Sequence, residues 1–348
     1  DYDVPTELGA EANRCRTAPY PTDTAGWHIG NHPQQMVGPH VSARMRYARA
    51  LGDTNGDGIR DMALGSLEIK ERFSNPAPGP DSPLTPGGST VGAVFVLYTR
   101  PAEVVGDYLL EQIALDPSNL NRLNGVYLKG TAAAPIGRAF DTAGNFNNDF
   151  DFNGEPVDDV VVGSPLSNNG DGEAIVLFGS ASNTLLSPAG GWTLDQAVAA
   201  GVAVRFRGSS GERAGYNVAG AGDVDNDGFG DVLIAAPGTG STAGAVYLIY
   251  GSERIVAGNT YNLSDVGTAS LPGVKFLGRN VGDFLGGGEV SDTLNPSGGA
   301  TTVISRGLAA LGDIDGDGRA DYAISAMRAR PNNRTNAGEV YVIYGRGD

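Results

Sequence analysis

The sequence predicts an all-β protein, and three observations support this class. A nine-residue acidic loop occurs four times in the 348 residues, and a short apolar run rich in β-branched residues follows each copy. A second apolar run that opens with glycine comes later in every unit. Glycine is abundant, with 53 residues, and charged residues make up only 18% of the chain, which is typical of a turn-rich protein. Four-stranded units repeated along a chain are typical of a β-propeller, so we expect one with four recognisable blades.

The four acidic loops predict four Ca²⁺ sites. Each loop has oxygen-bearing side chains at positions 1, 3, 5 and 9. Calcium takes six to eight oxygen ligands and accepts carboxylate, amide and backbone carbonyl groups together, so we also expect the carbonyl at position 7 to contribute. The predicted ligands are Asp53, Asn55, Asp57, Ile59 and Asp61; Asp151, Asn153, Glu155, Val157 and Asp159; Asp223, Asp225, Asp227, Phe229 and Asp231; and Asp313, Asp315, Asp317, Arg319 and Asp321.

These loops share only their first half with an EF-hand. An EF-hand needs a bidentate Glu at position 12 on a helix, whereas position 12 is aliphatic here, so each site must close at position 9 and lead into a strand. The second loop differs again, because Pro156 stands where the other loops have a glycine that allows positive φ. We therefore expect altered or additional ligands there, with Asn147, Asp149 and Asp158 nearby. The alternative for every loop is an Asp/Gly-rich surface turn without metal.

The repeats define the expected organisation of the chain. The last repeat shows no fourth strand after Tyr344, so we expect the N-terminal segment 1–40 to supply one and to close the ring. Insertions at 75–88 and 286–302 are predicted to be surface loops. The expected repeats within the domain 41–348 are residues 41–130, 131–208, 209–278 and 279–348.

The combined pattern resembles the FG-GAP repeat of integrin α-subunit propellers and of many secreted bacterial proteins. The resemblance rests on the acidic loop, on Gly163-Ser-Pro165 and Ala235-Ala-Pro237, and on Gly244-Ala-Val-Tyr247. It covers about residues 41–348 and implies that the loops hold Ca²⁺ on the blades. Integrin propellers have seven blades and this sequence shows four repeats, so the integrin mode of ligand recognition does not follow from the resemblance.

Charge and compartment narrow the possible partners. The formal net charge of −16 and the lack of a basic stripe argue against nucleic acid. No apolar run is long enough to cross a membrane. The chain begins at Asp1, which we interpret as a processed N-terminus, and several weak calcium sites suit a compartment with millimolar calcium. The expected location is extracellular, at the cell surface or periplasmic.

Three isolated features carry weaker signals. Cys15 has no partner within the chain, so it is expected to be buried or paired with another chain. His28, His32 and His40 lie in one stretch, which fits either a transition-metal site or ordinary surface packing. The terminal Arg346-Gly347-Asp348 fits an adhesion motif or chance.

Two functions are compatible with this sequence. The first is a calcium-stabilised binding, adhesion or surface-assembly module for protein or glycan partners, alone or in a homo- or hetero-assembly. The second is a secreted polysaccharide lyase or hydrolase that uses carboxylates outside the loops, such as Asp283, Glu289 or Asp292. Every strong motif is structural and no catalytic constellation is recognisable, so the binding module is favoured.

Overall fold

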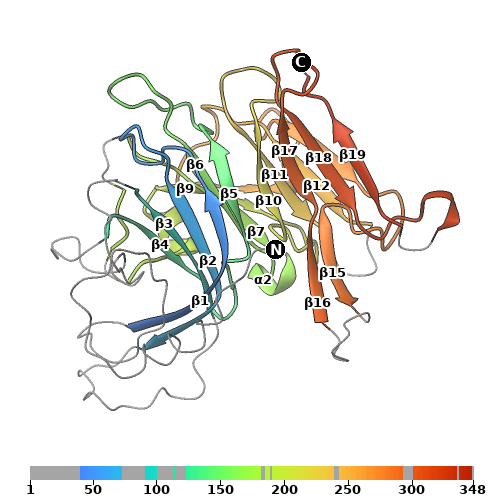
Figure 1. Ribbon diagram of the computed structural model, residues 1–348, viewed down its shortest axis with the longest axis horizontal. Coiled ribbons are helices and arrows are strands. Elements are labelled where there is room, and N and C mark those ends of the chain that lie inside the picture. The colour runs from blue at the N-terminus through green and yellow to red at the C-terminus, as the bar shows by residue number, and fades with distance from the viewer. Residues whose placement is uncertain are drawn as a thin grey trace, which may run out of the picture.

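The computed structural model describes residues 40–72, 91–99, 113, 123–181, 185–188, 190–238, 243–292, 301–334 and 337–346. These residues form a mostly β structure whose principal sheets follow one another across the molecule, from blue at the left to red at the right of Figure 1. The expected sheet-forming repeats are therefore present as antiparallel sheets. The segment 1–39, the insertion 75–88, Cys15, His28 and His32 lie outside the described residues, so ring closure and the division at residue 40 stay predictions.

The first two sheets each have five strands. The order is β1-β2-β3-β4-β8 in the first sheet and β5-β6-β7-β9-β13 in the second, and only the outermost pairings, β4 with β8 and β9 with β13, are parallel. The bounds are β1 (His40–Ala50), β2 (Met62–Arg72), β3 (Val91–Leu97), β4 (Gly125–Lys129) and β8 (Trp192–Thr193), then β5 (Ala139–Gly144), β6 (Asp159–Ser164), β7 (Glu173–Leu177), β9 (Ala203–Arg207) and β13 (Thr260–Asn262).

The third sheet has four strands and the fourth has three, in the orders β10-β11-β12-β14 and β17-β18-β19. Their bounds are β10 (Val218–Gly222), β11 (Asp231–Ala236), β12 (Ala245–Ile249), β14 (Gly273–Leu277), β17 (Leu308–Gly312), β18 (Asp321–Ala326) and β19 (Glu339–Ile343). Short helical segments connect some strands: α2 (Ser167–Gly170), α3 (Leu194–Ala199), η2 (Leu263–Asp265) and η3 (Pro331–Asn333). Among the described residues, no helix combines the length and apolar character needed to cross a membrane.

One predicted loop is in part a hairpin. Residues 286–302 were expected to be a surface loop, but β15 (Gly287–Asp292) pairs antiparallel with β16 (Thr301–Arg306). The sequence of β15 alternates polar and apolar residues at Glu289, Val290 and Ser291, and β16 is rich in β-branched residues, so both segments suit strands. The high glycine content of the insertion obscured these two strands in the sequence. The prediction for this insertion was therefore wrong over the two strands.

The hydrophobic core lies between neighbouring sheets. Along β11, Ile234 packs in the cluster between the second and third sheets, and the adjacent Leu233 packs in the cluster between the third and fourth. Successive side chains of a strand point to opposite faces, so a strand covered on both faces must be apolar throughout. This confirms the interpretation of the continuous apolar runs, and burying each such side chain stabilises the fold by about 1.5–3 kcal/mol.

The first strand of each sheet lies beside the first strand of the next. Contacts join β1 to β5, β5 to β10 and β10 to β17. A Cβ atom on Gly220 of β10 would lie 2.4 Å from the carbonyl oxygen of Thr142 on β5, so this close approach requires glycine. Each of these four strands is followed by an acidic loop, which places the four loops at one end of the sheets.

Candidate calcium-binding loops

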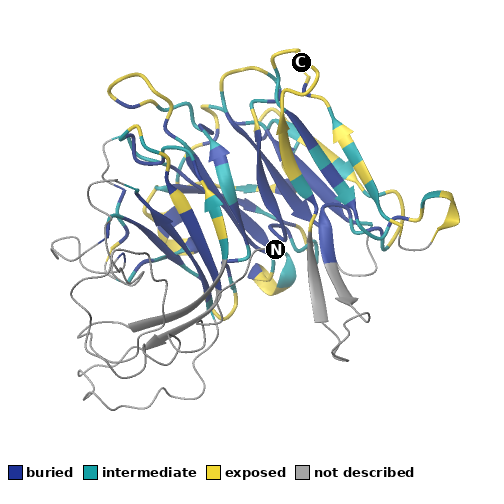
Figure 2. Ribbon diagram, in the orientation of Figure 1, coloured by how far each residue is buried: buried dark blue, intermediate teal, exposed yellow. Residues whose placement is uncertain are grey.

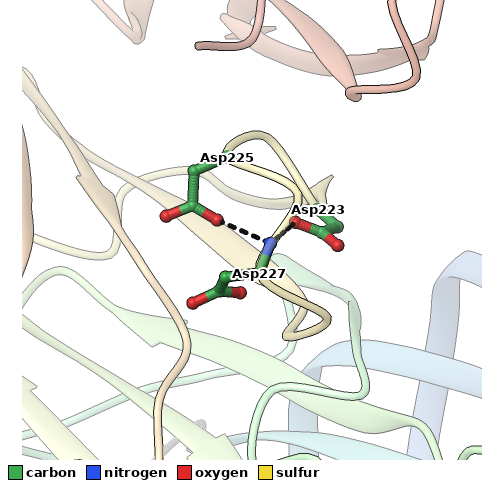
Figure 3. A group of neighbouring side chains, drawn as sticks. All are labelled: Asp223, Asp225 and Asp227. Atoms are coloured by element: carbon green, nitrogen blue, oxygen red, sulfur yellow. Dashed lines mark hydrogen bonds between the residues drawn. The ribbon is translucent and has the colours of Figure 1, made fainter. Parts of the chain in front are cut away.

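The third loop brings three carboxylates to one point. The carboxylate oxygens of Asp223, Asp225 and Asp227 lie within 4.8 Å of one another (Figure 3). The backbone N–H of Asp227 donates to Oδ1 of Asp223 at 3.1 Å and to Oδ1 of Asp225 at 3.2 Å. These bonds wrap the backbone around the first carboxylate, and the group of hard oxygen donors suits a cation such as Ca²⁺.

The closing Asp231 connects the loop to the sheet. It is fully buried, its Oδ2 accepts a hydrogen bond from the backbone N–H of Val224 at 2.8 Å, and its Oδ1 accepts one from Gly251 at 2.9 Å. Both oxygens are therefore fixed by the main chain. The same two bonds hold the other closing residues: Asp61 with Thr54 and Thr99, Asp159 with Phe146 and Gly179, and Asp321 with Ile314 and Gly345.

The loops are unfavourable places for negative charge without a cation. Burial raises the pKa of Asp231 to about 8. Burial, and then the charges of Asp227 and Asp223, raise the pKa of Asp225 to about 6. Burial also raises the pKa of Asp61 to about 6 and holds that of Asp159 well above its ordinary value. A bound divalent ion would reverse this balance, because its charge stabilises every ionised ligand.

The first and fourth loops repeat the arrangement. The backbone N–H of Asp317 donates to Asp313 at 3.1 Å and to Asp315 at 3.2 Å, and the oxygens of Asp313, Asp315 and Asp321 lie within 4.8 Å of one another. In the first loop the N–H of Asp57 donates to Oδ1 of Asp53 at 3.2 Å and to Oδ1 of Asn55 at 3.3 Å.

Left-handed backbone conformations also recur at fixed positions. Gly58, Gly228 and Gly318 at position 6 have φ between 81° and 94°, as predicted. Position 4 is left-handed as well, with φ of 71° at Gly56 and 63° at Asn226. Glycine and asparagine tolerate this conformation best, which explains why only these two residue types stand there.

The second loop begins six residues earlier than the sequence spacing suggests. The backbone N–H of Phe146, not one of residue 152, donates to the closing Asp159, at 2.9 Å. The N–H of Asp149 donates to Asn145 at 2.9 Å and to Asn147 at 3.3 Å, which repeats the bonds made by position 5 in the other loops. Asn148 is left-handed, with φ of 58°, as position 4 requires. Asn145, Asn147 and Asp149 therefore take positions 1, 3 and 5.

The predicted ligands Asp151, Asn153 and Glu155 form a separate turn. The N–H groups of Glu155 and Asn153 donate to Oδ1 of Asp151, and these bonds lower the pKa of Asp151. This turn sits at the tip of an insertion, residues 150–156, that replaces the position-6 glycine. Oδ1 of Asp149 is buried and accepts no hydrogen bond within the described residues, as expected for an oxygen that faces a cation.

The sequence did contain a signal for the correct register. The run Ala143-Gly-Asn-Phe-Asn-Asn-Asp149 matches Ala221-Gly-Asp-Val-Asp-Asn-Asp227 position by position, including the glycine that precedes position 1. Counting the nine positions back from the closing Asp159 starts the loop at Asp151, inside the insertion, and this count hid the match. Asn145 takes position 1 of this frame and is not among the predicted ligands.

Hydrogen bonds connect each loop to the next. The carbonyl of position 1 accepts a bond from the position-8 N–H of the following loop. The pairs, with their N···O distances, are Asp53 with Asp158 at 2.8 Å, Asn145 with Gly230 at 2.8 Å, and Asp223 with Ala320 at 2.9 Å. The carboxyl of Asp158 lies against Gly52, the residue before the first loop, and burial raises its pKa.

The carboxylates considered for catalysis gain no such support. Asp283 is buried and accepts hydrogen bonds from the backbone N–H of Asn280 at 2.9 Å and from its Nδ2 at 3.1 Å, which makes it part of a turn. The side chains of Glu289, Asp292 and His40 lie outside the described residues, as do Gly347 and Asp348 of the terminal motif.

Comparisons with known proteins agree with this geometry. The profile of the family described as "FG-GAP repeat" matches residues 214–249 and 307–343, which hold the third and fourth loops. The chain contains FG-GAP repeats. It is also distantly similar to integrin alpha subunits, with 24% identity to integrin alpha pat-2 of Caenorhabditis elegans over 298 residues, 82% of this chain and 18% of that protein. Integrin alpha-4 of Xenopus laevis is 30% identical over 183 residues, 51% of this chain and 14% of that protein.

A third relative, integrin alpha-PS5 of Drosophila melanogaster, is 28% identical over 179 residues, 51% of this chain and 14% of that protein. The chain thus spans less than a fifth of the length of these relatives. The likeness to secreted bacterial proteins stays a prediction.

Proposed function

We propose that this chain is a calcium-stabilised, integrin alpha-like FG-GAP β-propeller module that binds a protein ligand outside the cell, in adhesion or surface assembly. The observation that carries the proposal is the common hydrogen-bond frame of four loops, which in the third and fourth loops brings three carboxylates within 4.8 Å of one another. FG-GAP repeats and the distant similarity to integrin alpha subunits support it. A glycan partner is the alternative ligand class.

The calcium ligands follow from the loop geometry. Three loops use the predicted sets that begin at Asp53, Asp223 and Asp313. In the second, we assign Asn145, Asn147, Asp149, the carbonyl of Val157 and Asp159, which moves positions 1, 3 and 5 of the proposed site upstream of Asp151 and keeps positions 7 and 9. Bound calcium supplies positive charge that stabilises the clustered carboxylates, and it favours the folded state because the unfolded chain holds no such cluster.

Ring closure is part of the same proposal. The fourth sheet has three strands where the third has four, which leaves a position for one more strand. The N-terminal segment 1–40 is our candidate for this strand, with 41–348 as one domain. A closed ring would present the loops between strands as the binding surface.

Calcium removal tests the scaffold directly. Saturating Ca²⁺ at about 100 times its dissociation constant adds about 2.7 kcal/mol of stability per site. We expect EDTA to lower the melting temperature by at least about 5 °C and Ca²⁺ to restore it, with Mg²⁺ as the control ion. An unchanged melting curve and no calcium uptake in calorimetry would contradict the calcium sites. Calcium-dependent capture of purified extracellular matrix proteins, measured beside a glycan array, tests the ligand class.

A further inference from the structure

The residue at position 8 of the second loop reaches into the first loop. The backbone N–H of Asp158 donates to the carbonyl of Asp53 at 2.8 Å. The N–H of Ser180, which follows β7 of the same sheet, donates to the carbonyl of Thr54 at 3.0 Å. Positions 1 and 2 of the first loop are therefore bonded to the main chain of the second sheet.

The side chain of Asp158 adds to this junction. Its carboxyl lies against Gly52, where a Cβ atom would be only 1.5 Å from Oδ2 of Asp158. The same carboxyl faces the backbone N–H and the carboxylate of Asp53 and the charge of Arg60. Residues of the first loop thus surround a carboxyl that stands in sequence beside Asp159, the closing residue of the second loop.

Gly52 differs from the corresponding glycines of the other loops. Gly144, Gly222 and Gly312 precede position 1 in the second, third and fourth loops, and their φ values of 64°, 83° and 70° are left-handed. At Gly52 φ is not positive, so the backbone there does not require glycine. The missing side chain instead leaves room for the carboxyl of Asp158.

The other junctions between loops carry a small residue at this place. Position 8 is Gly230 in the third loop and Ala320 in the fourth, and a Cβ atom on Gly222 would lie 2.5 Å from the Cβ atom of Ala320. The main-chain bond from position 8 is common to the three described junctions. Among them, the carboxyl is therefore an addition at the junction of the first and second loops.

The first loop is built around Asp53. Its Oδ1 accepts hydrogen bonds from the backbone N–H of Gly56 at 2.8 Å and from those of Asn55 and Asp57 at 3.2 Å. Its Oδ2 accepts one from Gly58 at 2.5 Å. A group that holds the main chain of Asp53 therefore also holds the oxygens at position 1. Loss of such an outer group typically changes metal affinity by about 10- to 100-fold.

We propose that Asp158 is a positioning residue of the first calcium site, although its neighbour Asp159 closes the second. The carboxylate of Asp158 holds the start of the first loop from the adjacent sheet. It also adds a negative charge beside Asp53, which a cation in the loop offsets. The first site then depends on two sheets, and calcium bound there strengthens the junction between them. This inference rests on the calcium sites proposed above.

Hydrogen exchange measured by mass spectrometry tests the assignment on the full chain over a series of Ca²⁺ concentrations. Peptides that cover residues 52–61 and 145–159 give a separate calcium midpoint of protection for each loop. We expect Asp158→Ala to raise the midpoint of the first loop by about tenfold and that of the second by about threefold at most. Asp158→Asn keeps an oxygen acceptor and loses the charge, so it should raise the first midpoint by less.

Glu155→Gln is the matched control for the loss of charge. It removes one carboxylate at an exposed position of the insertion in the second loop and should leave both midpoints unchanged. Melting curves in EDTA separate positioning from a general structural role. Without a cation the carboxylates of Asp158 and Asp53 repel each other, so Asp158→Asn should melt no lower than the unmodified chain. A general structural role predicts a lower melting temperature in EDTA as well.

Three results would overturn the proposal: a larger shift for the second loop than for the first, equal shifts for both, and unchanged midpoints for both. Each of these results leaves the calcium sites themselves in place. If calcium protects no loop of the unmodified chain, the proposed calcium scaffold fails and this assignment fails with it.

Discussion

The second and third acidic loops use the same hydrogen bonds but differ in charge and length. The third loop places four carboxylates at its ligand positions, whereas the second places two amides, Asn145 and Asn147, and two carboxylates, Asp149 and Asp159. The second loop also carries the insertion 150–156 in place of one glycine. The backbone frame therefore depends on positions 1, 4, 5 and 9. The charge of the ligand side chains and the number of residues after position 5 can both change without changing this frame.

Replacing the closing carboxylate should have the largest effect. Asp231→Ala leaves the buried N–H groups of Val224 and Gly251 without acceptors and removes a proposed calcium ligand. Each such group costs about 1–3 kcal/mol, so we expect a loss of about 2–5 kcal/mol in the free energy of unfolding, measured by urea denaturation in Ca²⁺. Asp159→Ala should behave similarly.

Asp151→Ala is the matched control in the second loop. Asp151 lies in the turn at the tip of the insertion, so its removal should change unfolding far less than Asp159→Ala. A loss as large as that of Asp159→Ala would show that Asp151 is a main ligand after all and would reject the register that begins at Asn145.

Converting the second loop to the charge of the third should strengthen its calcium binding. The double substitution Asn145→Asp and Asn147→Asp adds two carboxylates, and the charge count of the ligands tunes calcium affinity over several orders of magnitude. We expect at least a tenfold gain at this site by titration calorimetry, together with lower stability in EDTA because of the added repulsion. Asn153→Asp, in the insertion, is the control and should leave the affinity unchanged.

The pH dependence of stability should have opposite signs with and without calcium. The folded-state pKa values of Asp231, about 8, and of Asp225 and Asp61, about 6, lie above the ordinary value of 3.8, so the calcium-free folded state binds more protons than the unfolded state. The stability of the calcium-free protein therefore falls as pH rises from about 4 to about 8.

Calcium reverses this trend because the metal competes with protons for the same oxygens. In EDTA we expect the melting temperature to drop by about 5 °C or more between pH 5 and pH 8, and in Ca²⁺ to rise over the same interval. Parallel curves in the two conditions would contradict the placement of calcium at these carboxylates.

Shortening the second loop should have the smallest effect. Replacing residues 150–156 by one glycine gives the sequence Asn-Phe-Asn-Asn-Asp-Gly-Val-Asp-Asp, which follows the nine-residue frame of the third loop. Phe152 is 88% exposed at the tip, and shorter loops cost little closure entropy, so we expect a change within about 1 kcal/mol. Loss of folding would show that the insertion contributes to the core.

The sequence allowed much of the fold to be predicted and less of the second site. Three features follow from local chemistry: the strands after each loop, the three described strands of the last sheet, and the left-handed glycines at position 6. A short apolar run suits few structures other than a buried strand, and few residues other than glycine adopt positive φ. The register of the second loop does not, because Asp151, Asn153 and Asp159 have the correct spacing in sequence, whereas Asp159 accepts its bond from Phe146 and Asp151 closes a separate turn. The hydrogen bonds from Thr99, Gly179 and Gly251 to the closing residues join positions distant in sequence and have no local signature.

Exposure also varies in a way that the sequence conceals. β12 and β19 have nearly the same apolar sequence, Ala-Val-Tyr-Leu-Ile and Glu-Val-Tyr-Val-Ile, yet β12 is buried on both faces, whereas β19 is half-buried on one face and exposed on the other (Figure 2). Val340 and Val342 are exposed because no described sheet follows the fourth. An apolar sequence shows that a strand is suited to burial, but the strand is buried only where a neighbouring sheet covers it.

Three hydrogen bonds, each from the first carbonyl of one loop to an amide of the next, connect the four loops in one row. If calcium occupies the loops as we propose, removing one ion would loosen an acceptor that the next loop uses. Neighbouring sites would then bind calcium cooperatively, and the stiffness of this end of the molecule would change over a narrower range of calcium concentration than one independent site allows.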